Sequence, residues 1–554
     1  HPPFPLPHFA ERRPTTTMPS CASTMQSLFR EIVRAKVYDV CIETPLQYAK
    51  FASAKLGNQI FLKREDLQPV FSFKLRGAFN KISNLTADQK KRGIVACSAG
   101  NHAQGVAMSA AELGIPATIV MPRTTPKIKI ASVESLGGNV VLDGDNYSEA
   151  YERALRVQKS EGRTLVHPFD DPLVIAGQGT IGMEILKQFK GDSLDAIFVC
   201  CGGGGMLAGI SVFMKTVHPH TKIIGVEASD AAGMTRSMEA GELVTLDHVG
   251  IFADGAAVKR VGDLTFELCR ELVDEMVLVD SDEICQAIRD AYYDTRTILE
   301  PAGALGMAGV KKYIRENSSS AQNFVVITSG ANMDFNQLRF ISDRAESSEK
   351  LVSLQIPEQP GAFKQLYYDL AYCNVKNTPR SISEFSYRFS DDEVAFIILS
   401  FGVTGPEDAD TVLKLLKIKG YHVSDLGENE MAKLHGRYLG GGRASLDNEV
   451  LYRFEFPERP GALEDFLNLL SDEERTVPYN VTMFHYRNRG SLENSVLVGM
   501  QISQDDKADL ELFLSQLGFV FFEETNNVMY QEFLNRPGNG KKAEMPDLRR
   551  MRTR

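Results

Sequence analysis

The sequence has no tryptophan, and it also lacks the features on which several common classes of protein depend. No apolar run approaches the roughly 18 residues of a membrane-spanning helix, so we expect no membrane segment. The net charge is -11 and no long basic block lies outside the ends of the chain, which argues against nucleic acid or an anionic membrane as partner. The eight cysteines form no C-x-x-C pair, so we predict neither a disulfide nor a metal site. These absences favour a small-molecule ligand.

At 554 residues the chain is too long for one core, and we expect two or three domains. From residue 36 to 345, short apolar runs indicate buried parallel strands, and alanine-rich stretches of helical length lie between them. The expected strands are 93–97, 117–121, 139–142, 196–200, 222–226 and 324–328. This α/β order predicts a largely parallel sheet with ligands at the carboxyl ends of the strands. We therefore look for function in the strand-to-helix loops.

One such loop holds four consecutive glycines, Gly202, Gly203, Gly204 and Gly205, and is followed by Met206. Glycines let consecutive backbone N–H groups converge on an anion, and the helix that follows adds its positive N-terminal end. The loop lacks the Lys-Ser/Thr of a nucleotide P-loop and the spacing G-x-G-x-x-G, which disfavours a nucleoside triphosphate or a dinucleotide. It predicts a phosphate cradle, and a flexible turn without a ligand is the alternative.

Two further loops carry polar groups at the start of a helical stretch. Ser98 and the N–H groups near Gly100 could receive a carboxylate, and Asn101 offers an amide to a ring hydroxyl, although an ordinary N-cap is equally compatible with this segment. Lys74 stands among apolar and small residues. A lysine desolvated there would have a lowered pKa, which Schiff-base chemistry and proton abstraction require, whereas a solvated surface lysine is the alternative.

These loops, together with Ser329-Gly330-Ala331-Asn332 after the last expected strand, resemble the fold-type II enzymes that depend on pyridoxal phosphate (PLP), the tryptophan synthase β-like fold with parallel sheets. Closer still, the runs 62–74 (LKREDLQPVFSFK) and 299–304 (LEPAGA) resemble the threonine dehydratases, also called threonine deaminases. The resemblance covers about residues 38 to 535 and implies a PLP-dependent catalytic domain over residues 36–345.

The resemblance implies a role for each loop. Lys74 would hold the cofactor covalently and abstract the α-proton, Asn101 would meet the cofactor's ring oxygen, and Gly202 to Met206 would bind its phosphate. Ser98 and Gly100 would bind the substrate. Ser329 would meet the pyridine nitrogen, and a hydroxyl there makes the cofactor a weaker electron sink than a carboxylate would, which favours prompt loss of a β-hydroxyl over transamination.

The implied reaction converts L-threonine, with L-serine as an alternative substrate, to a 2-oxo acid and ammonia. From threonine the 2-oxo acid is 2-oxobutanoate, which opens the route to L-isoleucine.

Beyond about residue 346 the sequence contains an internal repeat. The run Ile356-Pro-Glu-Gln-Pro-Gly-Ala recurs 100 residues later (357 to 457), and Phe-x-Tyr-Arg at 385–388 recurs 99 residues later (387 to 486). Each copy, at about 350–423 and 449–521, reads as a ferredoxin-like βαββαβ unit, and the pair resembles the duplicated ACT-like regulatory domain of biosynthetic threonine dehydratases. An amino-acid effector could contact Tyr387 or Tyr486, but a core strand residue is the alternative for either tyrosine.

The resemblance further implies inhibition by L-isoleucine, opposing activation by L-valine, and a homotetramer. Residues 1–35 are expected to be a disordered tail or the remnant of a transit peptide, which would place the protein in mitochondria or plastids, and otherwise in the cytoplasm. Residues 536–554 are expected to be a disordered tail. Two other functions remain open: a different PLP reaction, such as β-replacement or β-elimination from serine alone, and a non-enzymatic amino-acid sensor on an inactive catalytic fold.

Overall fold

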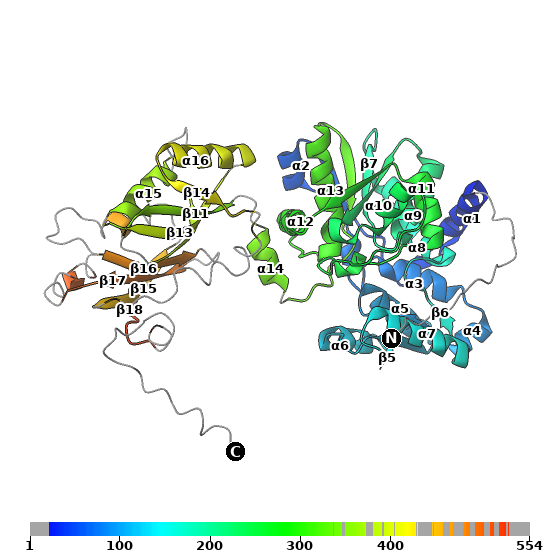
Figure 1. Cartoon of the computed structure of the whole chain (residues 1–554). Coiled ribbons are helices and arrows are strands. Elements are labelled where there is room, and N and C mark those ends of the chain that lie inside the picture. Colours follow the sequence, from blue (N-terminus) through cyan, green and yellow to red (C-terminus); the bar gives the residue numbers. More distant parts are fainter. Residues whose placement is uncertain are drawn as a thin grey trace, which may run out of the picture. The chain divides into compact units, whose positions relative to one another are not determined.

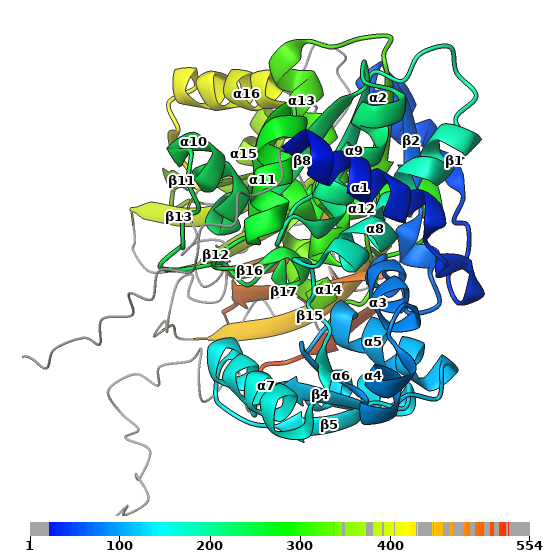
Figure 2. The ribbon, with the colours of Figure 1, turned by 90° about the vertical axis from the view of Figure 1, so that its right-hand side faces the viewer.

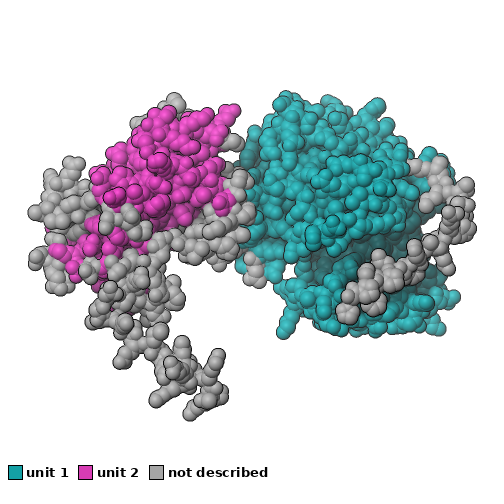
Figure 3. All heavy atoms as spheres, in the orientation of Figure 1, with its two compact units in different colours: residues 1–345 teal, residues 346–554 magenta. Residues whose placement is uncertain are grey.

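A computed structural model of the chain divides into two compact units, residues 1–345 and 346–554, which are described separately (Figures 1 and 3). The described residues are 21–335, 337–345, 349–359, 361–372, 380–389, 393–403, 405–427, 429, 446, 448–457, 466–468, 480–487, 493–503, 510–512, 514, 520–527 and 530. The predicted C-terminal tail and residues 1–20 of the predicted N-terminal tail lie outside this set. None of the helices in these segments is long and apolar enough to cross a membrane.

The first unit contains two sheets, which are parallel except for one edge strand. In the larger sheet the order is β1-β2-β10-β7-β8-β9, and only β1 runs antiparallel to its neighbour. Its strands are β1 Leu46–Tyr48, β2 Gln59–Lys63, β7 Ala196–Cys200, β8 Lys222–Ala228, β9 Glu275–Val279 and β10 Asn323–Ile327. In the smaller sheet the order is β5-β4-β3-β6, with strands β3 Ile94–Cys97, β4 Ala117–Met121, β5 Asn139–Leu142 and β6 Thr164–Leu165. The predicted parallel α/β architecture is confirmed.

Helices cover both sheets. Around the smaller sheet lie α3 Lys74–Ser83, α4 Ala87–Arg92, α5 Asn101–Glu112, α6 Lys127–Ser135 and α7 Tyr147–Glu161 (Figure 2). The other helices of this unit are α1 Cys21–Arg34, α2 Lys50–Leu56, α8 Pro172–Gln188, α9 Gly205–Val217, α10 Gly233–Ala240, α11 Asp263–Leu272, α12 Ser281–Thr295, α13 Pro301–Asn317 and α14 Gln337–Arg344. Strands β4 and β7 are buried at every position, as expected for strands with helices on both faces.

The expectation of a disordered tail over residues 1–35 is wrong for residues 21–34, which form α1. Leu28 and Ile32 are four residues apart, so they share one face of the helix, and both are buried against the core formed with α8 and α9. A Cβ at Gly179 of α8 would come within 2.6 Å of Ile32 Cδ1, so this glycine permits the close approach of α1. Serine and arginine in the segment obscured this apolar face in the sequence.

The second unit is built on one antiparallel sheet in the order β14-β11-β13-β12-β16-β17-β15-β18. Its described elements are β11 Glu349–Pro357, α15 Ala362–Ala371, β12 Ile382–Arg388, β13 Val394–Gly402, α16 Pro406–Ile418, β14 His422–Asp425, β15 Glu449–Pro457, β16 Asn480–Arg487, β17 Glu493–Gln501 and β18 Val520–Glu523. The first copy of the repeat therefore has the predicted βαββαβ order. In the second copy the four strands are described, whereas its Pro-Gly turn lies outside the described residues.

The two copies of the repeat join through the strands that carry Phe-x-Tyr-Arg. Strands β12 and β16 pair antiparallel, with Phe385 opposite Tyr486 and Tyr387 opposite Phe484. Ser386 faces His485, its own counterpart in the repeat, so an approximate twofold axis passes between these two residues. The pairing makes one continuous sheet from the described strands of the two copies.

Candidate active site

The predicted loops meet at the carboxyl ends of strands in the first unit. Ser72, two residues before Lys74, forms an isolated bridge with Gly330, and Phe73 N donates to Ser329 O at 3.1 Å. Asn332 Nδ2 donates to Asn101 Oδ1 at 2.7 Å, which joins the loop after β10 to the start of α5. The segments that carry Lys74, Asn101 and Ser329 are therefore in direct contact.

Lys74 begins α3 and is partly buried. Its Nζ donates a hydrogen bond to Pro168 O at 3.0 Å. Desolvation lowers the pKa of Lys74 to about 8, although nearby Cys200 and Glu300 act in the opposite direction. A pKa near 8 leaves part of the population as the neutral amine at physiological pH, and this neutral form can attack a carbonyl carbon or accept a proton.

The glycine loop follows β7, and its N–H groups are free to bind an anion. Helix α9 begins at Gly205, and Gly204 before it has φ of 90°, a left-handed conformation that favours glycine. Within the described chain, the N–H groups of Gly202 to Met206 have no hydrogen-bond acceptor. By contrast, the first N–H groups of α8 donate to the carboxylate of Asp171, and those of α11 donate to the carboxylate of Asp170. The loop therefore presents a row of donors without protein acceptors at a positive helix end.

Side chains could not replace these glycines. A Cβ at Gly203 would come within 2.2 Å of the Phe169 ring, and one at Gly202 within 2.9 Å of Ala256 O. At Gly204 a Cβ would meet Met234 Cε at 2.7 Å. The tight packing outside the loop and the donors without protein acceptors fit the phosphate of PLP, because backbone N–H groups at a helix N-terminus bind a dianion without needing a cation.

The start of α5 resembles the glycine loop in lacking a cap. Gly100 is the N-cap residue and no side chain caps the helix, while Ser98 Oγ accepts a hydrogen bond from Gly100 N at 3.3 Å. Asn101 is held from both sides, since its Oδ1 accepts from Asn332 and its Nδ2 donates to Glu300 Oε1 at 2.6 Å. Its amide is thus fixed in orientation next to Lys74's loop.

Ser329 lies at the end of β10, beside the end of β7. Its hydroxyl is buried and donates to Ala302 O at 3.3 Å, and it accepts a weak hydrogen bond from the Cys200 thiol at 3.3 Å. Burial raises the pKa of the Cys200 thiol to about 11, so this thiol stays protonated and remains a donor. The group at this position is therefore a neutral hydroxyl and not a carboxylate.

Glu300 is a site residue that the sequence motifs did not predict. It is 5% exposed, immediately precedes α13, and lies close enough to Lys74 for the two charges to interact. Desolvation raises the pKa of Glu300 to about 7, against the lowering effect of the bond from Asn101. The sequence does carry one signal for Glu300: in the run 299–304 (LEPAGA), this acid stands directly before a proline and an apolar helix.

The ionisation of Glu300 should be visible in the stability of the cofactor-free protein. Its folded pKa of about 7 lies above the ordinary value of 4.5, so the folded state binds more protons between these values. Stability contributed by the neutral carboxyl is complete below about pH 4.5 and is lost as the pH rises through 7, at up to about 1.4 kcal/mol per pH unit. We expect Glu300→Gln to remove this slope, as measured by denaturant unfolding of both proteins across this range. Parallel pH profiles for the two proteins would contradict the raised pKa.

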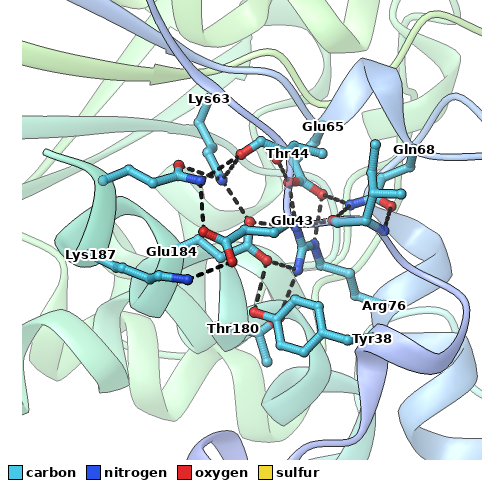
Figure 4. A network of polar contacts seen from close by, with 12 residues as sticks. Tyr38, Glu43, Thr44, Lys63, Glu65, Gln68, Arg76, Thr180, Glu184 and Lys187 are labelled. Atoms are coloured by element: carbon cyan, nitrogen blue, oxygen red, sulfur yellow. Dashed lines mark hydrogen bonds and ion pairs between the residues drawn. The ribbon is translucent and has the colours of Figure 1, made fainter.

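A buried ionic network fixes the helix that begins at Lys74 (Figure 4). Arg76 Nε and Nη2 each donate to Glu65 at 2.7 Å, and Nη1 and Nη2 donate to Glu184 at 2.6 and 2.9 Å. Lys63 Nζ also donates to Glu184, at 2.6 Å. These four side chains are at most 1% exposed, and their charges balance. They join α3 to β2, to the 3-10 helix η2 (Glu65–Leu67) and to α8.

The predicted effector residues lie in the second unit. Tyr387 donates its hydroxyl to Glu358 at 2.5 Å, in the repeated Pro-Glu-x-Pro-Gly turn, and its ring packs on Phe363 with centroids 4.8 Å apart. Burial and this carboxylate raise the pKa of Tyr387. Tyr486 is half-buried against the same core. Tyr387 thus combines a core position with a polar contact to the turn.

Comparison with known proteins identifies the family. Residues 37–330 match the model of the pyridoxal-phosphate dependent enzymes, and residues 342–435 and 440–534 match the C-terminal regulatory domain of threonine dehydratase. The biosynthetic L-threonine dehydratase of Burkholderia multivorans is 47% identical over 91% of this chain and 99% of its own length. The mitochondrial threonine dehydratase of Saccharomyces cerevisiae is 46% identical over 91% of this chain and 88% of its own length.

A solved structure agrees with these relatives. The processed form of threonine deaminase isoform 2 from Solanum lycopersicum is 48% identical, covers 58% of this chain and 89% of its own, and superposes with a TM-score of 0.57. The match to the regulatory domain in two consecutive segments parallels the internal repeat. The chain belongs to the pyridoxal-phosphate dependent enzymes, within the family of the biosynthetic threonine dehydratases.

Proposed function

We propose that this chain deaminates L-threonine to 2-oxobutanoate and ammonia with Lys74 as the lysine that holds PLP and as the base, and that L-isoleucine inhibits it through the second unit. The catalytic part of the proposal rests on two features of one site: Lys74, whose pKa is lowered by desolvation, and the N–H groups of Gly202 to Met206, which have no acceptor among the described residues. An amine and an anion cradle are the two groups that an aldehyde with a phosphate requires.

The residues would divide the work as follows. PLP supplies an electron sink for the α-carbon of the substrate. The N-terminus of α9 would hold its phosphate, Asn101 would lie beside its ring oxygen and Ser329 beside its pyridine nitrogen. The uncapped start of α5, with Ser98 and Gly100, would bind the substrate carboxylate, since helix N-termini favour anions.

Lys74 would act at the α-carbon of threonine. The lowered pKa of Lys74 leaves part of its amine neutral, and this neutral amine would take the α-proton. Beside the uncharged hydroxyl of Ser329, PLP would be a weaker electron sink than beside a carboxylate, which would favour prompt loss of the β-hydroxyl. The proton taken from the α-carbon balances the hydroxide that leaves as water. Elimination is therefore favoured over transamination.

The catalytic proposal is tested by product analysis of the purified, PLP-loaded chain. We expect L-threonine to yield 2-oxobutanoate and ammonia in equal amounts, with slower formation of pyruvate from L-serine. A β-replacement enzyme would instead consume a thiol in step with the amino acid, and product formed only in the presence of a thiol would refute the proposal.

The regulatory part concerns the turn that Tyr387 contacts. The family's regulatory domain spans both copies of the repeat, and the copies meet at the strands that carry the two tyrosines. We place L-isoleucine at the turn of the first copy, where Tyr387 and Glu358 meet, and at the corresponding Tyr486 in the second. L-valine would oppose it by favouring the active state, because an effector shifts an equilibrium only through different affinities for the two states.

Removal of the Tyr387 hydroxyl should weaken the response to isoleucine. In Tyr387→Phe the carboxylate of Glu358 loses a hydrogen bond, and bonds to charged groups contribute about 1.5–3 kcal/mol. We expect the L-isoleucine concentration for half-inhibition to rise about tenfold or more. Tyr421→Phe is the matched control, since Tyr421 makes a similar bond to Asp369 at 2.7 Å in the same copy and should respond as the wild type does. Equal sensitivity of Tyr387→Phe and wild type would remove Tyr387 from the effector site.

Two further properties complete the proposal. We expect a homotetramer, which light scattering of the purified chain would test. We also expect an organelle location if the first residues act as a transit peptide, and relatives named mitochondrial and chloroplastic support this. Fusion of residues 1–35 to a fluorescent protein would test it, with a cytoplasmic signal as the contradicting result.

A further inference from the structure

The carbonyl oxygens of the glycine loop are held by the protein on the side away from the free N–H groups. Gly203 O accepts hydrogen bonds from Thr265 Oγ1 at 2.6 Å and from Gly262 N at 3.3 Å. Gly204 O accepts from Ala208 N at 2.8 Å, in the first turn of α9. In a trans peptide the C=O and the N–H point in opposite directions. The bond at Gly203 O therefore directs the N–H of Gly204 to the opposite side, toward the cradle.

Thr265 is itself held rigidly. It lies in the first turn of α11 and is fully buried, so its hydroxyl is shielded from bulk water. The Asp170 carboxylate accepts hydrogen bonds from the first backbone N–H groups of this helix, those of Asp263 at 3.1 Å, Leu264 at 3.0 Å and Thr265 at 3.3 Å. The Thr265 hydroxyl donates to Gly203 O at 2.6 Å, and the more distant Gly262 O at 3.2 Å is a weaker acceptor for the same proton.

The segment 167–170 links this arrangement to the lysine. Pro168 O accepts from Lys74 Nζ, the Phe169 ring packs where a Gly203 side chain would be, and Asp170 caps α11. The helix that carries Thr265 is thus attached to a segment that also contacts Lys74. The geometry of the phosphate end and of the amine end of the site depends on the same short stretch of chain.

We propose that Thr265 is a positioning residue for the phosphate of PLP, because its hydroxyl fixes the Gly203–Gly204 peptide with the Gly204 N–H facing the phosphate. This inference rests on the proposed role of Gly202 to Met206. Without the hydroxyl, the peptide could rotate and turn its carbonyl oxygen toward the phosphate, which would repel it. The glycines that make the loop close-fitting also make it free to rotate in this way, so the loop needs an external anchor.

The test compares two ligands in the full chain. Thr265→Val keeps the shape of the side chain but removes the hydroxyl, and Thr265→Ser keeps the hydroxyl. For each cofactor-free protein, titration with PLP and with pyridoxal, which lacks the phosphate, gives two dissociation constants from the absorbance of the lysine-bound aldehyde. We expect Thr265→Val to bind PLP about tenfold more weakly, equivalent to about 1.4 kcal/mol, and to bind pyridoxal as the wild type does. Thr265→Ser should restore PLP binding.

Several outcomes would overturn the inference. Equal weakening of PLP and pyridoxal by Thr265→Val would mean a general structural role, and unchanged PLP binding would mean none. If the wild type itself bound pyridoxal as tightly as PLP, the cradle would hold no phosphate, and the proposed site would fail together with the inference. A shift in the phosphorus resonance of bound PLP in Thr265→Val, absent in Thr265→Ser, would support the inference independently of activity.

Discussion

Lys74→Ala is expected to lower the turnover of L-threonine by at least about 10³-fold, because both the attachment of the cofactor and the transfer of the α-proton lose their amine. Lys74 is the amine at the junction of the loops after β3, β7 and β10, and desolvation brings its pKa to about 8. The variant should also lose the absorbance of the lysine-bound cofactor. Steady-state assays of 2-oxobutanoate and an absorbance spectrum measure both effects.

Two controls make this result specific. Lys159→Ala removes an exposed lysine from α7 and should leave turnover and spectrum unchanged. The cofactor-free forms of Lys74→Ala and of the wild type should unfold at similar temperatures, because the Lys74 amine makes a single hydrogen bond to a carbonyl oxygen. Appreciable turnover by Lys74→Ala, with the spectrum of a lysine-bound cofactor, would exclude Lys74 from both roles.

Arg76→Met is expected to destabilise the first unit by about 3–5 kcal/mol, since it leaves the carboxylate of Glu65 buried without its cation. Both Glu65 and Arg76 are fully buried, and the guanidinium makes two bonds to this carboxylate. Methionine retains the apolar stem, so the change isolates the charge. The shift in the urea midpoint of the first unit, followed on the cofactor-free protein, measures the effect.

The contrast with an exposed ion pair tests the physical reason. Arg236 and Glu239 form a bridge of 3.1 Å on α10, with both side chains more than half exposed. Arg236→Ala should therefore change stability by less than about 1 kcal/mol. Because the buried network fixes α3, Arg76→Met should also weaken PLP binding, which Arg236→Ala should not. Equal stability of the two variants would show that the network does not hold α3.

Sequence patterns predicted the strands that are buried on both faces. The apolar runs 117–121 and 196–200 coincide with β4 and β7, because a central parallel strand has little polar surface to expose. The run 139–142 coincides with β5, which lies at the edge of the smaller sheet and is only partly buried. Strand β2 escaped this criterion, since its last residue is the charged Lys63, whose buried amine is satisfied by bonds to Thr44 O, Glu184 and Gln188. Joining of the two repeats through β12 and β16 could not be predicted either, as it depends on pairing between strands 99 residues apart in the chain (386 to 485).

The same distinction applies to the site. The groups that local sequence predicts are those in loops directly after strands, namely the glycine loop and the segments around Asn101 and Ser329. The groups that it missed act through distant contacts. Glu300 reaches Asn101 across 199 positions of the chain, and Thr265 reaches Gly203 across 62. Thr265 has no local pattern that separates it from an ordinary residue near the start of a helix, and the acid-proline pattern at Glu300 does not by itself indicate contact with Asn101.

The central claim is that Lys74 lies in the catalytic site and that the duplicated second unit controls this site. It is tested most directly by the rate at which the full chain forms 2-oxobutanoate from L-threonine, measured across a titration with L-isoleucine. We expect PLP-dependent turnover that L-isoleucine suppresses and that L-valine partly restores. Turnover that is indifferent to isoleucine would leave the catalytic assignment standing but contradict the control, and absence of turnover with bound PLP would contradict the assignment itself.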